Sequence, residues 1–208
     1  MVVSCGLRIR NHSDSGICLA SKGLGAAAKA PDALEFTENG KCERGMKQLL
    51  IVRHAKSAWS DATLRDFDRP LNKRGEHNAA EMGARLKARS LVPQQVISSP
   101  ARRALRTAQL VAAQFDYPAA NIEIVDELYE AGTGDWLALI GALSESLECV
   151  LVVGHNPTVT ELASLLCPAA RIDNVPTCGV LHLGYGNTPW RAVAGARPLE
   201  WDFDYPKR

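Results

Sequence analysis

Three short apolar runs in this chain each lead into side chains that can bind or attack a phosphate group. Arg53 and His54 follow the run LLIV, Arg103 comes shortly after VIS, and His155 follows CVLVVG. A guanidinium group matches phosphate oxygens in pairs, and an imidazole can either donate a hydrogen bond to an oxygen or attack phosphorus. Two arginines and two histidines gathered around one small dianion point to phosphoryl transfer.

The elements that must position these side chains follow a pattern typical of an α/β sheet with helices on its faces. From residue 46 onward, short apolar runs alternate with amphipathic segments. In such sheets, ligands bind beyond the carboxyl ends of strands, where loops enter helices. The predicted strands are QLLIV (48–52), QQVIS (94–98), IEIV (122–125), CVLVVG (149–154) and GVLHLGY (179–185).

The spacing of apolar residues predicts three helices. Apolar residues over 101–115 recur every three or four positions and form one stripe. Two further apolar faces are Trp136, Ile140, Leu143 and Leu147, and Val159, Leu162, Ala163 and Leu166.

Two of these helices carry signals for their starting points. Ser99-Pro100 and Asn156-Pro157 each read as an N-cap residue followed by proline at the first helical position. A helix start offers unpaired N–H groups to an anion. Arg103 would lie about 200° around the helix from Ala101, off the buried stripe, and would therefore reach the loop region.

Composition indicates one globular unit and excludes several classes of partner. The chain has 208 residues, of which 46% are hydrophobic and 23% charged. Its net charge of +1 gives no electrostatic argument for binding nucleic acid or an anionic membrane surface. No apolar run approaches the roughly 20 residues that a membrane span needs, so we expect a soluble protein without a membrane partner. Anion selectivity must therefore be local.

The first 45 residues differ from the rest of the chain in their residue pattern. They predict a flexible N-terminal extension ahead of one domain at 46–208. The segment mixes Gly, Ala, Ser and charged residues without a period. It is weakly similar to an organellar transit peptide, and a mis-assigned start upstream of Met46 explains it equally well. Six cysteines without a C-x-x-C pair favour a reducing compartment and predict small buried residues. We expect a cytoplasmic location, or an organelle stroma or matrix if the extension is a transit peptide.

Five ordered segments carry a resemblance to a known family. LLIVRHAKSAWSD, DFDRPLNKRG, VISSPARRALRTAQ, LYEA and LVVGHNP together resemble the histidine phosphatase superfamily, specifically its small SixA-type phosphohistidine phosphatase branch. The DRPL segment followed by Arg-Gly (68–75) favours that branch over the phosphoglycerate mutase branch, which usually has Gly where this chain has Ala55. The resemblance covers the chain from residue 46 to about its C-terminus. It implies a three-layer α/β/α sandwich of the phosphoglycerate mutase-like fold.

The resemblance also implies roles for the residues at the strand ends. His54 would be the nucleophile that becomes transiently phosphorylated. Arg53, Arg103 and His155 would complete the phosphate pocket. Glu130, in ELYEA, would protonate the leaving group, although some SixA-type members lack this carboxylate.

Other polar side chains near these segments have weaker assignments. Ser60 and Asn156 are additional candidates for substrate binding. Asp66, Asp68 and Arg69 are interpreted as ion-paired loop residues that shape the mouth of the site. His182 is interpreted as a hydrogen-bonded histidine within a strand, and Trp59 and Trp136 as lid or core residues.

No metal or cofactor is expected. His54, His155 and a nearby carboxylate could form a three-ligand zinc centre, but two arginines pressed against a dication would be repelled.

The leading hypothesis is a phosphatase that removes phosphate from a phosphohistidine-containing protein. A small-molecule phosphomonoesterase of the same superfamily is a second hypothesis. A non-catalytic protein that binds phosphorylated partners is a third, although loss of one of the four residues at the strand ends would have signalled that case and all four are present. The oligomeric state is left open.

Overall fold

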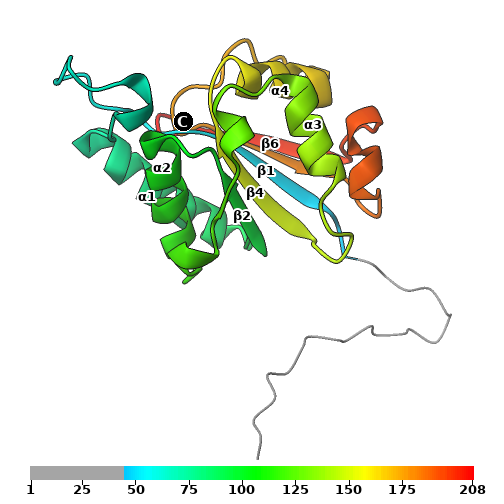
Figure 1. Ribbon diagram of the computed structural model, residues 1–208. Coiled ribbons are helices and arrows are strands. Elements are labelled where there is room, and N and C mark those ends of the chain that lie inside the picture. The colour runs from blue at the N-terminus through cyan, green and yellow to red at the C-terminus, as the bar shows by residue number, and fades with distance from the viewer. Residues whose placement is uncertain (1–44) are drawn as a thin grey trace, which may run out of the picture. The chain divides into compact units, whose positions relative to one another are not determined.

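The computed structural model describes residues 45–208, which form one sheet with helices on both faces (Figure 1). Six strands run in the order β3-β2-β4-β1-β5-β6. The first four of these are parallel, whereas β5 pairs antiparallel with β1 and β6 pairs antiparallel with β5. The predicted extension over 1–45 lies outside the described residues except for its last position. The strands are β1 (Gln48–Arg53), β2 (Gln95–Ser98), β3 (Glu123–Ile124), β4 (Cys149–Gly154), β5 (Val180–Gly184) and β6 (Glu200–Asp204).

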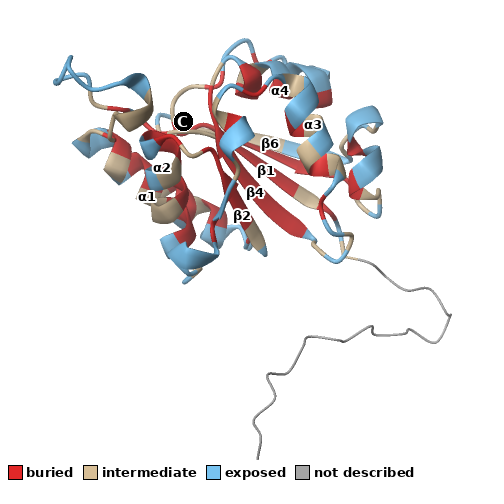
Figure 2. Ribbon diagram, in the orientation of Figure 1, coloured by how far each residue is buried: buried red, intermediate tan, exposed pale blue. Residues whose placement is uncertain are grey.

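Two helices cover each face of the sheet, and the side chains of β1 alternate between them. Leu50 and Val52 belong to the apolar cluster that contains residues of α1 and α2, whereas Leu49 and Ile51 belong to the cluster that contains residues of α3 and α4. The four inner strands β2, β4, β1 and β5 are largely buried, whereas the edge strands β3 and β6 and the outer helix faces are more exposed (Figure 2). The predicted three-layer sandwich is therefore confirmed. The helices are α1 (Lys73–Ala88), α2 (Arg102–Ala113), α3 (Thr133–Gly141) and α4 (Thr158–Leu166).

All five predicted strands are present, and β4 has the predicted bounds. β4 is buried at every position, which explains its unbroken apolar run, because a central parallel strand is covered on both faces. The apolar stripe over 101–115 corresponds to α2. α3 ends at Gly141, so Leu143 and Leu147 follow the helix rather than extending it. β6 was not predicted, because EWDFD is a half-exposed edge strand with three acidic residues in five.

Both predicted helix caps are wrong. Ala101, not Ser99, holds the cap position of α2, and Pro157, not Asn156, holds that of α4. The polar side chains make tertiary contacts instead. Ser99 Oγ pairs with Nε2 of His155 at 2.8 Å, and the amide of Asn156 donates to the loop before β5.

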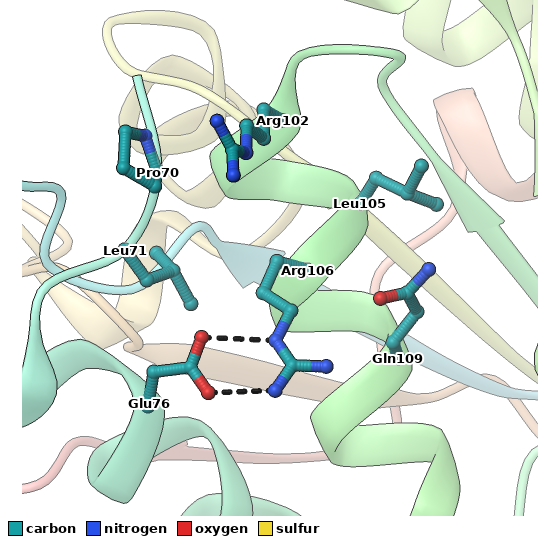
Figure 3. A pocket seen from close by; sticks show the side chains of 7 residues that line it. All are labelled: Pro70, Leu71, Glu76, Arg102, Leu105, Arg106 and Gln109. Carbon is teal, nitrogen blue, oxygen red and sulfur yellow. Dashed lines mark hydrogen bonds and ion pairs between the residues drawn. The ribbon is translucent and has the colours of Figure 1, made fainter. Parts of the chain in front are cut away.

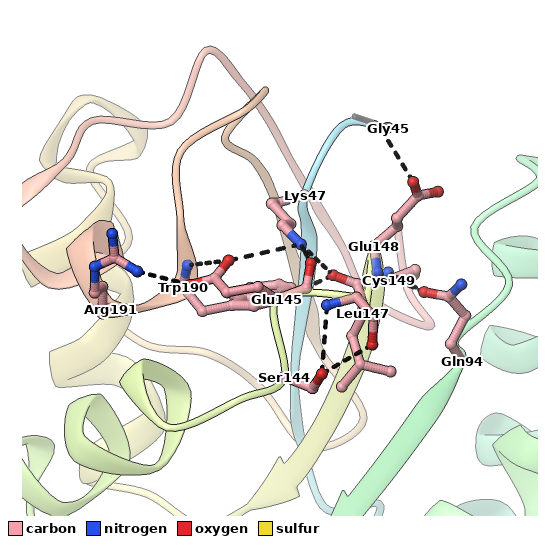
Figure 4. A network of polar contacts seen from close by, with 11 residues as sticks. Gly45, Lys47, Gln94, Ser144, Glu145, Leu147, Glu148, Cys149, Trp190 and Arg191 are labelled. Atoms are coloured by element: carbon pink, nitrogen blue, oxygen red, sulfur yellow. Dashed lines mark hydrogen bonds and ion pairs between the residues drawn. The ribbon is translucent and has the colours of Figure 1, made fainter. Parts of the chain in front are cut away.

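Lys47 ties the loop before β4 to the amino end of β1. Its ammonium donates to the carbonyl oxygens of Glu145 at 2.6 Å and Leu147 at 2.7 Å, and lies 5.6 Å from the centroid of the Trp190 ring (Figure 4). A buried ammonium group needs such acceptors to offset the loss of its hydration. These contacts help to set the register of β1 and β4, whose opposite ends carry the predicted site.

Cys149, Cys167 and Cys178 are buried and unpaired, as predicted, while the other three cysteines lie outside residues 45–208. Burial raises the pKa of Cys149 and of Cys178 to about 12, so both thiols stay protonated at neutral pH. No helix in the described part of the chain is long and apolar enough to span a bilayer.

Candidate active site

The predicted residues meet at the carboxyl ends of three neighbouring strands. β4 lies between β1 and β2 in the sheet, so the loops that follow these strands are adjacent. His54 follows β1, His155 follows β4, and Arg103 is the second residue of α2, after β2. Arg103 Nε lies 3.3 Å from His54 Nε2, and Arg103 Nη2 lies 3.4 Å from His155 Nδ1. The two imidazole rings have their centroids 5.1 Å apart.

The backbone around His54 is held from two sides. The N–H of His54 donates to the carbonyl of Gly154 at 2.9 Å, which continues the pairing of β1 with β4. The N–H of Ala55 donates to Oγ1 of Thr107 at 3.0 Å, and this hydroxyl donates in turn to the carbonyl of Arg103 at 2.7 Å. The turn that carries His54 is thus tied to the helix that carries Arg103.

The imidazole of His54 has a defined tautomer. Its Nδ1 lies 2.7 Å from the carbonyl oxygen of Ala55. A carbonyl oxygen can only accept, so Nδ1 carries the proton and Nε2 carries the lone pair in the neutral ring. This lone pair accepts a hydrogen bond from Arg103 Nε. The unprotonated nitrogen of the His54 ring therefore points into the cationic cluster.

His155 is oriented by Ser99 and Arg103. Its Nδ1 accepts from Arg103 Nη2, so Nε2 carries the proton and donates to Ser99 Oγ at 2.8 Å. Ser99 and His155 are both buried. The hydroxyl that was predicted to cap a helix therefore fixes the second imidazole of the site.

Both imidazoles are held in the neutral form at pH 7. Burial, with the nearby charges of Arg103, Arg53 and Arg69, lowers the pKa of His54 to about 4, although the hydrogen bond to Ala55 opposes this shift. Burial, followed by the charges of His54, Arg103 and Arg53, lowers the pKa of His155 to about 3. A neutral imidazole is the form that can act as a nucleophile.

Arg53 and Asn156 converge on the loop before β5. Arg53 Nη1 donates to the carbonyl of Val175 at 2.7 Å, and its Nε is buried without a partner among the described residues. Asn156 Nδ2 donates to Asn174 Oδ1 at 3.0 Å, while its Oδ1 is buried and unpaired in the same part of the chain. Both side chains thus keep polar atoms that a ligand can use.

Asp66, in the short 3-10 helix η1 (Asp66–Asp68), makes the contact with Arg103 that sequence reasoning missed. Its Oδ2 accepts from Arg103 Nη2 at 2.7 Å and from the hydroxyl of Tyr129 at 3.0 Å, and its Oδ1 pairs with Arg69. Asp66 was correctly predicted to form an ion pair in this loop. The only sequence signal for its role was the three-residue spacing to Arg69, which does not reveal the contact with Arg103.

The segment that follows η1 is attached to the loop that follows His54. The N–H of Ala58 donates to Pro70 O at 2.8 Å, and the N–H of Asn72 donates to Lys56 O at 3.0 Å. A Cβ atom added to Gly75 would lie 2.2 Å from Lys56 O, so only glycine allows this approach. The DRPL and Arg-Gly segments therefore join η1 and α1 to the loop that follows His54.

Glu130 and Ser60 lie at the periphery of this cluster. Glu130 is exposed and lines a pocket of about 300 Å³ together with His155, Asn156 and Tyr129. The pocket lining does not include Arg103, whose guanidinium is covered by the carboxylate of Asp66. Ser60 is exposed, and no hydrogen bond within residues 45–208 joins it to the site.

The other polar candidates belong to the surrounding structure. His182 is buried in β5 and is hydrogen-bonded to Gln48 and Arg89, as predicted. Arg106 is exposed and forms a bidentate ion pair with Glu76 of α1, at 2.9 and 2.7 Å, in a surface hollow of about 250 Å³ (Figure 3). Within the described residues, no group of three or more His, Cys, Asp or Glu side chains is arranged to hold a metal ion.

Two tryptophans flank the site. Trp136 is fully buried in the core beneath the end of β4, where its ring would lie 2.3 Å from a Cβ added to Gly154. Trp59 is 72% exposed, and its ring stacks on the guanidinium of Arg69 with 3.6 Å between Arg69 Cζ and the ring centroid. Trp136 is therefore a core residue, and Trp59 is a surface residue beside the site.

Comparison with known proteins identifies the family of this chain. Residues 49–148 match the model of the histidine phosphatase superfamily (branch 1). An uncharacterized chloroplastic protein of Arabidopsis thaliana is 31% identical over 76% of this chain and 76% of its own length. The phosphohistidine phosphatase SixA of Escherichia coli is 33% identical over 58% of this chain and 74% of its own length.

A solved structure extends the likeness to the fold. The protein histidine phosphatase SixA in complex with tungstate superposes with a TM-score of 0.62 and 26% identity, over 76% of this chain and 94% of that chain. Together with the matched segments, this supports the fold and the phosphatase activity that the sequence predicted. The chain therefore belongs to the histidine phosphatase superfamily and is a phosphatase.

Proposed function

We propose that this phosphatase hydrolyses phosphohistidine in a protein through a covalent phospho-His54 intermediate. The observation that carries the proposal is the unprotonated Nε2 of His54, which lies 3.3 Å from Arg103 Nε and accepts a hydrogen bond from it. The likeness to SixA, whose name describes a phosphohistidine phosphatase, supports the choice of substrate. The complex of a SixA with tungstate, a tetrahedral oxyanion, supports a phosphate position in the same fold.

The first step transfers the phosphoryl group to the enzyme. The lone pair of His54 Nε2 forms a bond to phosphorus while the P–N bond of the substrate breaks in line with it, and the departing imidazole takes a proton from water. Arg53 and Arg103 stabilise the equatorial oxygens. A bound dianion also favours protonation of His155 Nδ1, which then donates to the same oxygens.

The second step restores the enzyme. Water attacks the phosphorus atom of phospho-His54, the bond from Nε2 to phosphorus breaks, and orthophosphate leaves. The hydrogen bond from Nδ1 to Ala55 O keeps Nε2 free of a proton, ready for the next cycle. No metal or cofactor is part of this proposal.

A small-molecule phosphomonoesterase is the second candidate, and the position of Glu130 favours it. An alkoxide leaving group needs a proton donor, whereas imidazole is a far better leaving group. Glu130 and His155 line the same pocket, so the carboxyl group lies on the side of the cluster that His155 borders. Glu130→Gln should then slow hydrolysis of alkyl phosphates more than that of phosphohistidine, and equal losses on both substrates would remove this role.

The decisive experiment compares turnover of a phosphohistidine protein with that of serine and sugar phosphates. We expect the phosphohistidine protein to be hydrolysed fastest, and an acid-labile 32P label to be trapped on the wild type. His54→Ala should lose both turnover and label, whereas His77→Ala, a change on the exposed face of α1, should keep both. Preferred hydrolysis of a sugar phosphate would establish the second candidate, and retained turnover in His54→Ala would remove the nucleophile.

We propose a cytoplasmic protein, with an organelle stroma or matrix as the alternative. The chloroplastic relative supports the alternative. Expression of the full chain and of residues 46–208 as fluorescent fusions would distinguish the two, because only the full chain would reach an organelle.

A further inference from the structure

Beside the two arginines of the proposed mechanism lies a third whose donors are not all used. The side chain of Arg69 is only 11% exposed. Its Nε and Nη1 are buried and have no hydrogen-bond partner among the described residues. Buried N–H groups are normally paired, so two orphaned donors on one guanidinium indicate an acceptor from outside the described residues, such as a bound anion.

A single carboxylate connects Arg69 to Arg103. Oδ1 of Asp66 accepts from Arg69 Nη2, and Oδ2 accepts from Arg103 Nη2 at 2.7 Å. The two oxygens of a carboxylate are part of one small anion, so both guanidinium groups reach the same anion-sized volume. The hydroxyl of Tyr129 donates to this volume from a third direction. A phosphate group offers more acceptor oxygens than a carboxylate and can engage the same donors.

The backbone and a ring hold Arg69 in this position. Residue 70 is joined to the loop after His54 by the hydrogen bond from Ala58 N to Pro70 O, at 2.8 Å. The ring of Trp59 lies on the guanidinium. An arginine stacked and anchored in this way loses little further freedom when it binds an anion.

We propose that Arg69 binds the phosphoryl oxygens of the substrate together with Arg103, in the place that the carboxylate of Asp66 takes in this structure. The inference rests on the proposed function in that it places a phosphoryl group at His54. Electrostatics agree with the placement. Burial is the main cause of the lowered pKa of His54, and the charge of Arg69 adds to it, so Arg69 acts on the nucleophile from close by.

The test measures binding of inorganic phosphate to the full-length protein by calorimetry, without turnover. Arg69→Gln should weaken phosphate binding by about tenfold or more, as expected when a charged donor to an anion is removed. Arg65→Gln is the matched control, because Arg65 pairs with Asp68 at the same three-residue spacing but its side chain is 81% exposed. We expect the control to stay within about twofold of the wild type.

A second background separates direct binding from an indirect effect through Asp66. In Arg69→Gln the carboxylate of Asp66 is left to pair with Arg103 alone, which could itself exclude phosphate. The same change is therefore made in Asp66→Asn. If Arg69→Gln still weakens binding about tenfold there, Arg69 contacts phosphate. If the loss disappears in that background, Arg69 acts only on Asp66 and the proposal is overturned.

Two further outcomes keep the test decisive. Arg69→Lys retains the positive charge but loses the paired donors of the guanidinium group. Its phosphate affinity should therefore lie between those of the wild type and Arg69→Gln. If Arg69→Gln does not fold, Arg69→Lys is measured in its place. Equal phosphate binding in wild type and Arg69→Lys would overturn the fork as the binding group. If the protein does not hydrolyse phosphohistidine but Arg69→Gln still weakens phosphate binding tenfold, the proposed function is wrong and Arg69 is still a phosphate-binding residue.

Discussion

Asp66→Asn should strengthen the binding of phosphate, because it removes an internal anion from Arg103, the arginine that we propose to bind the substrate. In the structure, Asp66 Oδ2 accepts from Arg103 Nη2 at 2.7 Å. A dianion that binds Arg103 in the same direction must first break this ion pair. The amide of asparagine has nearly the same shape and can still accept one hydrogen bond, but it carries no charge.

The magnitude follows from the type of bond and its exposure. A hydrogen bond to a charged group contributes about 1.5–3 kcal/mol. The side chain of Asp66 is 48% exposed, so solvent screening reduces its ion pair to about 1 kcal/mol. Relief of this competition corresponds to a gain of about fivefold in affinity. The inhibition constant for orthophosphate in a steady-state assay should therefore fall by about that factor.

Asp68→Asn provides the control, because Asp68 pairs with the exposed Arg65 at the other end of η1. Its inhibition constant should stay within about twofold of the wild-type value. The reasoning is refuted if Asp66→Asn binds phosphate more weakly than the wild type. In that case the carboxylate would serve to hold Arg103 in its competent position, rather than to compete with the substrate.

Three further predictions concern the two imidazoles and the loop that follows His54. Because the pKa of His54 is lowered to about 4, the folded protein binds fewer protons than the unfolded chain between about pH 4 and 6.5, so urea unfolding should show stability falling as pH is lowered through this range. Ser99→Ala should leave the buried Nε2–H of His155 unpaired, lowering the unfolding free energy by about 1–3 kcal/mol and also reducing kcat. Gly75→Ala should lower the melting temperature and the activity together, since its Cβ would lie 2.2 Å from Lys56 O, which cannot move without the loop after His54.

Matched variants show whether these effects have the proposed causes. Ser98 is also buried, but its hydroxyl donates to a backbone carbonyl, so Ser98→Ala should leave kcat nearly unchanged. A Cβ added to Gly134 meets no atom within 4 Å, so Gly134→Ala should be neutral or slightly stabilising. Unfolding that is independent of pH between 4 and 6.5, or loss of kcat in Ser98→Ala as large as in Ser99→Ala, would contradict the reasoning.

The parts of the fold that depend on burial alone were readable from the sequence. β4 was predicted with its bounds because a strand covered on both faces is apolar throughout. β6 was missed because an edge strand with a half-exposed face carries charges that resemble those of a loop. The end of α3 was placed too late because Leu143 is buried whether or not it is helical, so its pattern imitates another turn.

The site shows the same division. Arg103 and His155 were predicted because each follows closely on a recognisable apolar run and the strand ends converge. Ser99 was wrongly predicted to cap a helix, because a serine before a proline is typical of an N-cap. The sequence does not reveal its actual partner, His155, which lies 56 residues away. Asp66, Asp68 and Arg69 were expected to be ion-paired loop residues, but the contact of Asp66 with Arg103 depends on the path of a loop, which apolar periodicity does not encode.

The position of β4 between β1 and β2 has a consequence for protein synthesis. β1 and β2 leave the ribosome first, but β4 lies between them in the sheet. They cannot be joined until residues 149–154 have been made. His155 then arrives directly behind the strand that completes the centre. A nascent or truncated chain that stops before this point would therefore carry His54 and Arg103 but lack His155, so we expect activity to begin only after β4 has been inserted.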